Sequence, residues 1–339
     1  MSRRPGARWP AALLAAATVL AGCGTGTPAD PPSVPAGTTS TSAPAPSVPP
    51  SPATSSTPAD PAPSPSTRSE PARPELPRGG RSVFPEHRLV GYAGRTGSPA
   101  LGRLGIGDLD TRVRELERRA KPYAADGRTV LPVLEVIATT VQASPGRDGK
   151  YRTRMGDKEV ERYLRAARKR DALLLLAVQP GRADLSDEVE AYDRWLAEPD
   201  VGVALDPEWA MGPREVPGRV FGSTTGAELD AVARHLSALT TEHDLPEKVM
   251  VFHELAPRIV TGEGRLRPHR GVVAVKSIDG IGSRAAKENT YRVVGRDTPK
   301  GVRTGFKLFY EEDREGGRRL MTPAQVMALE PRPAYVMYE

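Results

Sequence analysis

The stretch Val201–Trp209, which reads VGVALDPEW, ends an apolar run in two carboxylates separated by a proline. Residues i and i+2 of a strand share one face, so we expect Asp206 and Glu208 to point the same way, with Cα atoms about 6.6 Å apart. Pro207 cannot donate a ladder hydrogen bond, so an inner strand should stop there. Paired carboxyl groups suit acid–base chemistry, because an ionised neighbour raises the pKa of its partner.

Further polar side chains stand at or near the ends of the other apolar runs. They are Tyr92, Glu135, Gln179, Trp209, His253, Glu254, Lys276, Asp279, Lys307, Tyr310, Glu311 and Glu312. Charged groups that converge inside a protein cost desolvation energy unless they are paired or solvated. The presence of so many polar side chains at the ends of the apolar runs therefore predicts a polar pocket.

Apolar runs of strand length alternate with amphipathic, helix-like segments over the C-terminal three quarters of the chain. The runs are Leu89–Ala93, Val130–Ile137, Ala172–Gln179, Val201–Asp206, Val249–Glu254, Val272–Ile278, Val302–Tyr310 and Ala334–Tyr338. The helix-like segments are Asp110–Tyr123, Asp157–Lys169, Asp187–Leu196, Ala227–His243, Ser283–Val294 and Thr322–Leu329. Several of these open with Asp, Ser or Thr, as helix N-caps do.

This order predicts an α/β domain over residues 83–339, folded as a (β/α)8 TIM barrel that lacks a regular last helix. Near-continuous apolar strands are typical of a parallel sheet covered by helices. A segment that does not look helical, Ala256–Arg270, follows the fifth run, and Val83–Arg88 is expected to cover the position of the missing helix. In such a barrel, catalytic groups lie where the strands end.

The acidic pair, followed by Trp209 at the end of the fourth strand, resembles the D-x-E motif of several glycoside hydrolase families on this fold. Lysozyme-type muramidases and chitinase-like enzymes are among them. The resemblance implies that Glu208 is the general acid and that Asp206 supports it or orients a carbohydrate substrate. The fuller DxxDxDxE pattern of the chitinase type is absent, because GVALDPE holds only its last two acids.

A second arrangement pairs Glu208 with Glu311 on the seventh strand, where many retaining glycosidases carry their nucleophile. The usual Asn-Glu of those enzymes on strand four is absent here. In both arrangements we expect Trp209 and the other strand-end residues, apart from Glu311 and Glu312, to bind substrate.

Two alternatives stay open. A non-catalytic lipoprotein could use the same polar mouth to bind a sugar or an envelope component, with its carboxylates paired to lysines or arginines. Lys276, on the sixth strand, resembles the Schiff-base lysine of dihydrodipicolinate synthase-like aldolases, which makes a lyase the minor alternative.

The N-terminal residues predict export and anchoring. Arg3, Arg4 and Arg8 precede the apolar segment Ala11–Leu20, which is too short to span a bilayer as a stable helix. The residues LAGC that end at Cys23 resemble the lipobox of bacterial lipoproteins, in which the cysteine is acylated and becomes the new N-terminus. We therefore expect a signal peptide over residues 1–22 and a lipid anchor on the extracytoplasmic face of the cell membrane.

Residues 23–82 are expected to be the lipidated cysteine and a disordered linker rich in Pro, Ser and Thr, with a mean reach of about 45 Å. Linker acids and bases cancel and the signal peptide carries three arginines, so the barrel domain has a net charge of +6 − 3 = +3. That charge is too small to indicate nucleic-acid binding. Cys23 is the single cysteine, and the sequence contains neither a metal-binding motif nor a cofactor-binding motif. We therefore expect neither a metal nor a cofactor. We also expect a monomer.

Overall fold

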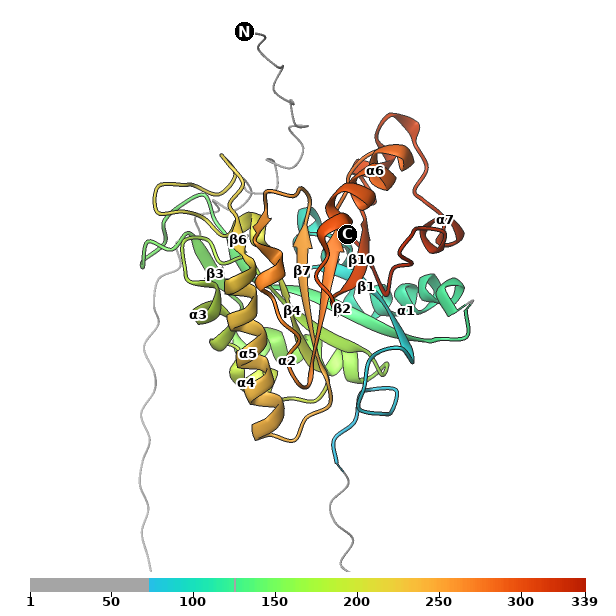
Figure 1. The fold of residues 1–339 in the computed structure, drawn as a ribbon, viewed down its shortest axis with the longest axis horizontal. Coiled ribbons are helices and arrows are strands. Elements are labelled where there is room, and N and C mark those ends of the chain that lie inside the picture. The colour runs from blue at the N-terminus through green and yellow to red at the C-terminus, as the bar shows by residue number, and fades with distance from the viewer. Residues whose placement is uncertain (1–72, 125) are drawn as a thin grey trace, which may run out of the picture. The chain divides into compact units, whose positions relative to one another are not determined.

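The computed structural model describes residues 73–124 and 126–339 (Figure 1). The expected signal peptide, Cys23 and most of the expected linker lie outside these residues. No helix in this part of the chain is long and apolar enough to cross a membrane.

Nine strands form one sheet in the order β1-β11-β10-β9-β7-β5-β4-β2-β3, and β1 also pairs with β2. Only β3 is antiparallel to its neighbour, so the other eight form a closed parallel barrel. The barrel strands are β1 (His87–Gly94), β2 (Thr129–Val141), β4 (Leu173–Val178), β5 (Val201–Leu205), β7 (Lys248–Glu254), β9 (Val272–Ile278), β10 (Arg303–Leu308) and β11 (Tyr335–Tyr338). The predicted TIM barrel is confirmed, and each predicted apolar run overlaps one of its strands.

Helices lie outside the strands (Figure 1). They are α1 (Leu109–Ala120), α2 (Asp157–Arg168), α3 (Leu185–Glu190), α4 (Asp193–Leu196), α5 (Gly226–Glu242), α6 (Arg284–Val294) and α7 (Pro323–Met327). After β7 the chain forms only a short strand β8 (Val260–Thr261), which pairs with β6 (Thr224–Thr225), and the 3-10 turn η6 (Glu263–Arg265). The sequence predicted the absence of a helix at this point.

Side-chain caps fix where several helices begin. Asp108 accepts a hydrogen bond from the Thr111 amide at the start of α1, and Ser283 caps α6. Thr225 and Glu228 form a complete capping box at α5. Such caps satisfy amides that the first helical turn leaves unpaired.

The strands alternate between two hydrophobic layers, as a period of two requires. Leu131, Val133 and Leu175 belong to the cluster inside the barrel, whereas Leu134 and Leu176 pack in the layer between strands and helices. Whether a strand residue faces the barrel interior or the helices is therefore set by its parity, which also decides which strand-end residues reach the mouth.

The chain before β1 closes the lower end of the barrel, where the strands begin. Leu76 and Val83 are buried in the inner cluster, and Arg81 donates to the carbonyls of Asp244 and Leu245. The expectation that Val83–Arg88 replaces the missing helix was wrong, because Val83 enters the barrel interior and β1 begins at His87. Part of the segment that we assigned to the linker belongs to the packed domain.

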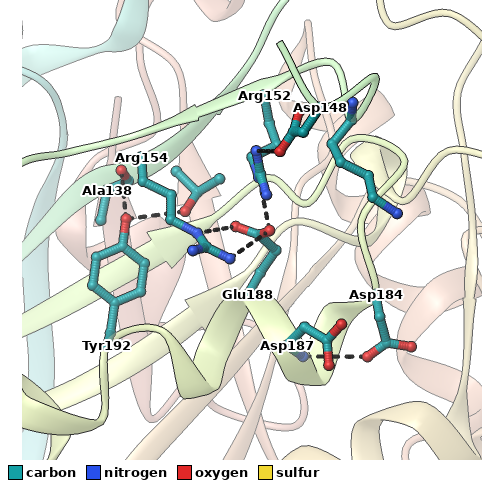
Figure 2. A network of polar contacts seen from close by, with 10 residues as sticks. Ala138, Asp148, Arg152, Arg154, Asp184, Asp187, Glu188 and Tyr192 are labelled. Carbon is teal, nitrogen blue, oxygen red and sulfur yellow. Dashed lines mark hydrogen bonds and ion pairs between the residues drawn. The ribbon is translucent and has the colours of Figure 1, made fainter. Parts of the chain in front are cut away.

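An overhanging hairpin continues the barrel wall beyond the end of β2. The strand β3 (Arg152–Arg154) pairs with the last residues of β2. Arg152 and Arg154 both donate to the carboxylate of Glu188 on α3, at distances between 2.7 and 2.9 Å (Figure 2). Glu188 is fully buried, so this ion cluster fixes the hairpin beside the mouth.

Candidate active site

A cavity of about 90 Å³ lies at the carboxyl ends of the barrel strands. Its lining includes the predicted residues Glu135, Gln179, Asp206, Glu208, Trp209, Asp279 and Lys307, together with Ala93, Ala100, Leu101, Ile137, Ala177, Phe221, Leu255, Ile281, Phe309, Glu312 and Glu339. Glu312 is also among the residues predicted to form the pocket. Eight predicted residues, drawn from β2, β10 and the segments that follow β4, β5, β9 and β10, thus meet in one place.

The acidic pair reaches this cavity by a route that differs from the predicted one. The strand β5 ends at Leu205, and Pro207–Trp209 forms a 3-10 turn. Asp206 and Glu208 are therefore not consecutive residues of one strand face, so the i, i+2 geometry does not apply. Pro207 ends the strand, as expected, and the tight turn brings both carboxyl groups to the cavity.

Glu208 is half-buried, and its Oε2 atom is buried without a hydrogen-bond partner. Burial, together with the negative charges of Asp206 and Asp279, raises its pKa well above the usual value of 4.5. The backbone around it is fixed, since the Gly222 amide donates to the Glu208 carbonyl at 2.7 Å. This environment favours the protonated form of the Glu208 carboxyl group.

Asp206 is buried at the base of the cavity and accepts a hydrogen bond from Gln179 Nε2 at 3.1 Å. Gln179 is itself oriented by the Val141 amide, which donates to its Oε1 atom. Burial raises the pKa of Asp206 to about 6, although the charges of His253 and Lys307 act against that rise. The two carboxyl groups therefore divide near neutral pH into one ionised member and one protonated member.

A row of charged residues, Glu135–His253–Asp279–Lys307–Glu339, runs beside this pair, and all but the half-buried Glu339 are buried. His253 Nδ1 lies 2.8 Å from Asp279 Oδ2, and His253 Nε2 lies 3.2 Å from Glu135 Oε1 without the alignment of a hydrogen bond. Lys307 Nζ lies 3.4 Å from Asp279 and 2.5 Å from Glu339. The row is charge-paired along its length.

Protonation states in the row follow from these contacts. Burial works against the charged form of His253, but Asp279 and Glu135 outweigh burial and raise the pKa of the imidazole well above 6.5. The opposite balance holds the pKa of Asp279 at about 2, because His253 and Lys307 overcome the effect of burial. The row therefore contains an imidazolium between two carboxylates.

The sequence reading missed residues on β9, β10 and β11 that support this row. Ser277 Oγ donates to Asp279 Oδ1 at 2.8 Å, and the Tyr335 hydroxyl donates to Glu135 Oε2. Gly305 makes room for the tyrosine, since a Cβ at that position would lie 2.8 Å from the Tyr335 ring. The alternation of inward and outward side chains along a strand would have placed Ser277 and Tyr335 inside the barrel, because their neighbours in sequence face outward.

Two predicted binding residues, Glu254 and Lys276, point away from the cavity. Both are fully buried between the barrel wall and the outer elements, where Lys276 Nζ lies 2.9 Å from Glu254 and 2.7 Å from Glu263. Lys276 also donates to the Val294 carbonyl at the end of α6. The parity of β9 sends Ser277 inward and Lys276 outward, so a Schiff-base lysine at the mouth is excluded and the aldolase alternative is dropped.

Tyr92 and Tyr310 also face outward. Their hydroxyls lie 3.3 Å apart, and the Tyr92 hydroxyl donates to Glu115 on α1. Glu311 is exposed on a separate surface hollow, and its neighbour Glu312 lines the cavity instead. The structure thus does not bring these three predicted residues to the site.

The apolar part of the cavity wall includes three aromatic rings. Trp209 packs edge-on against Phe221 at 6.2 Å between ring centroids, and Phe309 lines the wall beside Lys307. Glu312 stands near Glu339 and Glu311, and burial together with these like charges raises its pKa. The site therefore combines carboxyl groups with flat apolar faces.

No protein-family model matches the chain, and no curated protein matches it either. Within residues 73–124 and 126–339, no group of three or more His, Cys, Asp and Glu is arranged to hold a metal ion.

Proposed function

We propose that this chain is a membrane-anchored lipoprotein whose barrel hydrolyses glycosidic bonds, with Glu208 as the general acid. The observation that carries the proposal is the buried, unpartnered Oε2 atom of Glu208 in the cavity at the carboxyl ends of the strands. A carboxyl group with a raised pKa is the device by which glycosidases protonate a leaving oxygen.

The chemistry requires two carboxyl groups in different states. Glu208 gives its proton to the glycosidic oxygen as the bond from that oxygen to the anomeric carbon breaks. A water molecule adds to the anomeric carbon, and its proton returns to a carboxylate. Asp206 is the nearest ionised partner in sequence, and its hydrogen bond from Gln179 favours the ionised form.

Features of the cavity wall support a carbohydrate ligand. Trp209, Phe221 and Phe309 supply flat apolar surfaces of the kind that pack against sugar rings. The volume is smaller than the ~300 Å³ at which ordinary ligand sites begin.

The anchored location rests on the arginines, the apolar segment and Cys23 at the N-terminus. An enzyme held there would meet cell-wall or environmental polysaccharide. Replacement of Cys23 by Ser would test the anchor separately, since it should make the protein extractable from the membrane fraction by high salt without altering the barrel.

The activity test uses the chain from residue 24 onward, its Glu208→Gln variant and the matched control Glu315→Gln, an exposed site outside the cavity. Release of reducing ends from a panel of wall and storage polysaccharides is measured for all three. The proposal expects activity in the wild type and the control and its loss in Glu208→Gln. Equal activity of all three proteins would remove Glu208 from the mechanism.

A second function, binding without catalysis, is favoured by the pairing of the charged row. Lys307 lies beside Asp279 and Glu339, and His253 lies between Glu135 and Asp279, so each carboxylate of the row has a cationic neighbour. If the folded wild type hydrolyses nothing in the panel, a ligand-induced rise in Tm with mono- and oligosaccharides would support this second function.

A further inference from the structure

A groove of about 830 Å³ lies at the opposite end of the domain, beside the first residues of β2. Its charged lining consists of Arg78, Arg114, Glu117, Arg118, Lys121, Arg128 and Arg170. Six cations and one anion give this lining a net charge of 6 − 1 = +5. Residues 1–72 carry +1, so residues 73–339 carry +6 − 1 = +5 in total, and this lining alone matches that excess. Positive charge is therefore concentrated at this end.

Three of these cations form a stripe along α1 and the turn that follows it. Arg114, Arg118 and Lys121 are spaced i, i+4 and i+7, which places them on one face of a helix. All three are exposed. Arg114 reaches only the Thr111 hydroxyl, and neither Arg118 nor Lys121 has an ion pair or hydrogen bond in the described chain. Like charges at this spacing destabilise a helix. The stability of α1 therefore does not explain why these three cations share one face.

Other cations of the groove are partly neutralised. Arg170 lies 3.5 Å from Glu117, and Arg128 lies 3.7 Å from Asp126. The stripe of Arg114, Arg118 and Lys121 is the part that remains open to an anionic partner.

The position of the groove indicates which anion it meets. Arg78 belongs both to the groove lining and to the segment by which the described chain enters the barrel. In Figure 1 this segment (blue) lies below the barrel, while the arrowhead of β7 points up toward the mouth. Cys23 precedes Arg73 by only 50 residues. A chain anchored at Cys23 would hold this basic end within reach of lipid headgroups.

We infer that the basic groove docks the barrel on anionic phospholipid headgroups, with the cavity at the opposite end turned away from the membrane. Basic clusters beside a membrane anchor bind anionic headgroups, and each cation contributes to the attraction. The inference rests on the proposed anchor for the choice of anion and for the orientation, and it is independent of the proposed hydrolysis.

The test measures co-sedimentation of the unlipidated chain from residue 24 onward with vesicles of phosphatidylcholine, with and without phosphatidylglycerol. The docking variant carries Arg114→Gln, Arg118→Gln and Lys121→Gln. The matched control removes the same charge at the mouth end through Arg147→Gln, Lys150→Gln and Arg214→Gln, all exposed positions. Because these proteins lack Cys23, neither anchoring nor hydrolysis affects the result.

We expect binding to the anionic vesicles alone, weakened by salt, and reduced roughly 100-fold in the docking variant, at about fivefold for each cation. The control should bind as the wild type does. Absence of anionic-vesicle binding, or an equal loss in both variants, would overturn the inference. Binding to soluble poly(glycerol phosphate) without vesicle binding would also overturn it, and would assign the groove to an anionic polymer.

Discussion

Asp206 and Glu208 line one cavity on either side of Pro207, yet only the Asp206 carboxyl accepts a side-chain hydrogen bond. Gln179 Nε2 donates to Asp206 Oδ2 at 3.1 Å, whereas Glu208 Oε2 is buried without a partner. A donor favours the ionised form and its absence favours the protonated one. This asymmetry supports the proposed acid role of Glu208 and the proposed role of Asp206 as its ionised partner.

The pH dependence of hydrolysis should report this pair. We expect kcat/KM to fall as the pH drops through about 6, because Asp206 then gains a proton. On the basic side kcat/KM should fall only where Glu208 loses its proton, at a pH well above 4.5. An acidic limb that stays flat down to about pH 4, the ordinary range of exposed carboxyls, would contradict the assignment of Asp206.

Glu208 should cost the protein stability. The pKa of Glu208 is raised in the folded state. The protonated side chain therefore contributes fully to the free energy of unfolding below about pH 4.5, and this contribution is lost as the pH rises through the folded-state pKa. Glu208→Gln removes this loss, and its Tm should therefore exceed that of the wild type by an amount that grows from pH 4 to pH 8. Glu315→Gln, at an exposed site, should show a difference that does not grow. A Glu208→Gln variant that is less stable at pH 8 would contradict the raised pKa.

The barrel was predictable because its signals are local and repeated. Runs such as Ala172–Gln179 are too apolar to face water on either side, and helix-like segments separate most of them. The path of Val83 was not predictable in this way, since its burial inside the barrel depends on contacts that only the closed sheet provides.

The candidate site was predictable only in part, because its residues were selected by their position near strand ends and not by parity. Lys276 and Asp279 are three residues apart, so only one of them can face the interior, and it is Asp279. Parity likewise separates inward His253 from outward Glu254. The contact between Tyr335 and Glu135 joins residues 200 positions apart, and no local pattern in a single sequence indicates it.

Removal of one charge from the row should destabilise the protein between the two pH limits at which the row titrates. His253 contributes below about 6.5 and loses that contribution as the pH rises through its raised folded value, while Asp279 contributes above about 3.8 and loses it as the pH falls through about 2. Between about pH 4 and 6.5, His253→Gln should lower the free energy of unfolding by roughly 3 kcal/mol, because it leaves buried carboxylates unpaired.

Urea denaturation measures this loss, with His243→Gln at an exposed position as the control. A His253→Gln/Glu135→Gln double variant should recover part of the loss and keeps the test informative if the single variant folds poorly. Equal stability of the His253→Gln and His243→Gln variants would show that the row is not charged as described.

The hairpin over the mouth should depend on Glu188, the buried carboxylate between Arg152 and Arg154 (Figure 2). Glu188→Gln should cost roughly 1–3 kcal/mol, the range for hydrogen bonds to charged groups, and should raise amide hydrogen exchange along β3. Glu190→Gln, exposed on the same helix, is the matched control. Unchanged exchange in β3 would mean that backbone pairing alone holds the hairpin.

The most direct test of the central claim compares two substrates of the Glu208→Gln variant, once the polysaccharide panel has identified the sugar. One is a natural glycoside, whose leaving oxygen needs a proton, and the other is a dinitrophenyl glycoside of the same sugar, whose leaving group does not. A general acid at Glu208 predicts a loss of about 10²–10⁴-fold on the first substrate and little loss on the second. An equal loss on both substrates would contradict the acid role of Glu208.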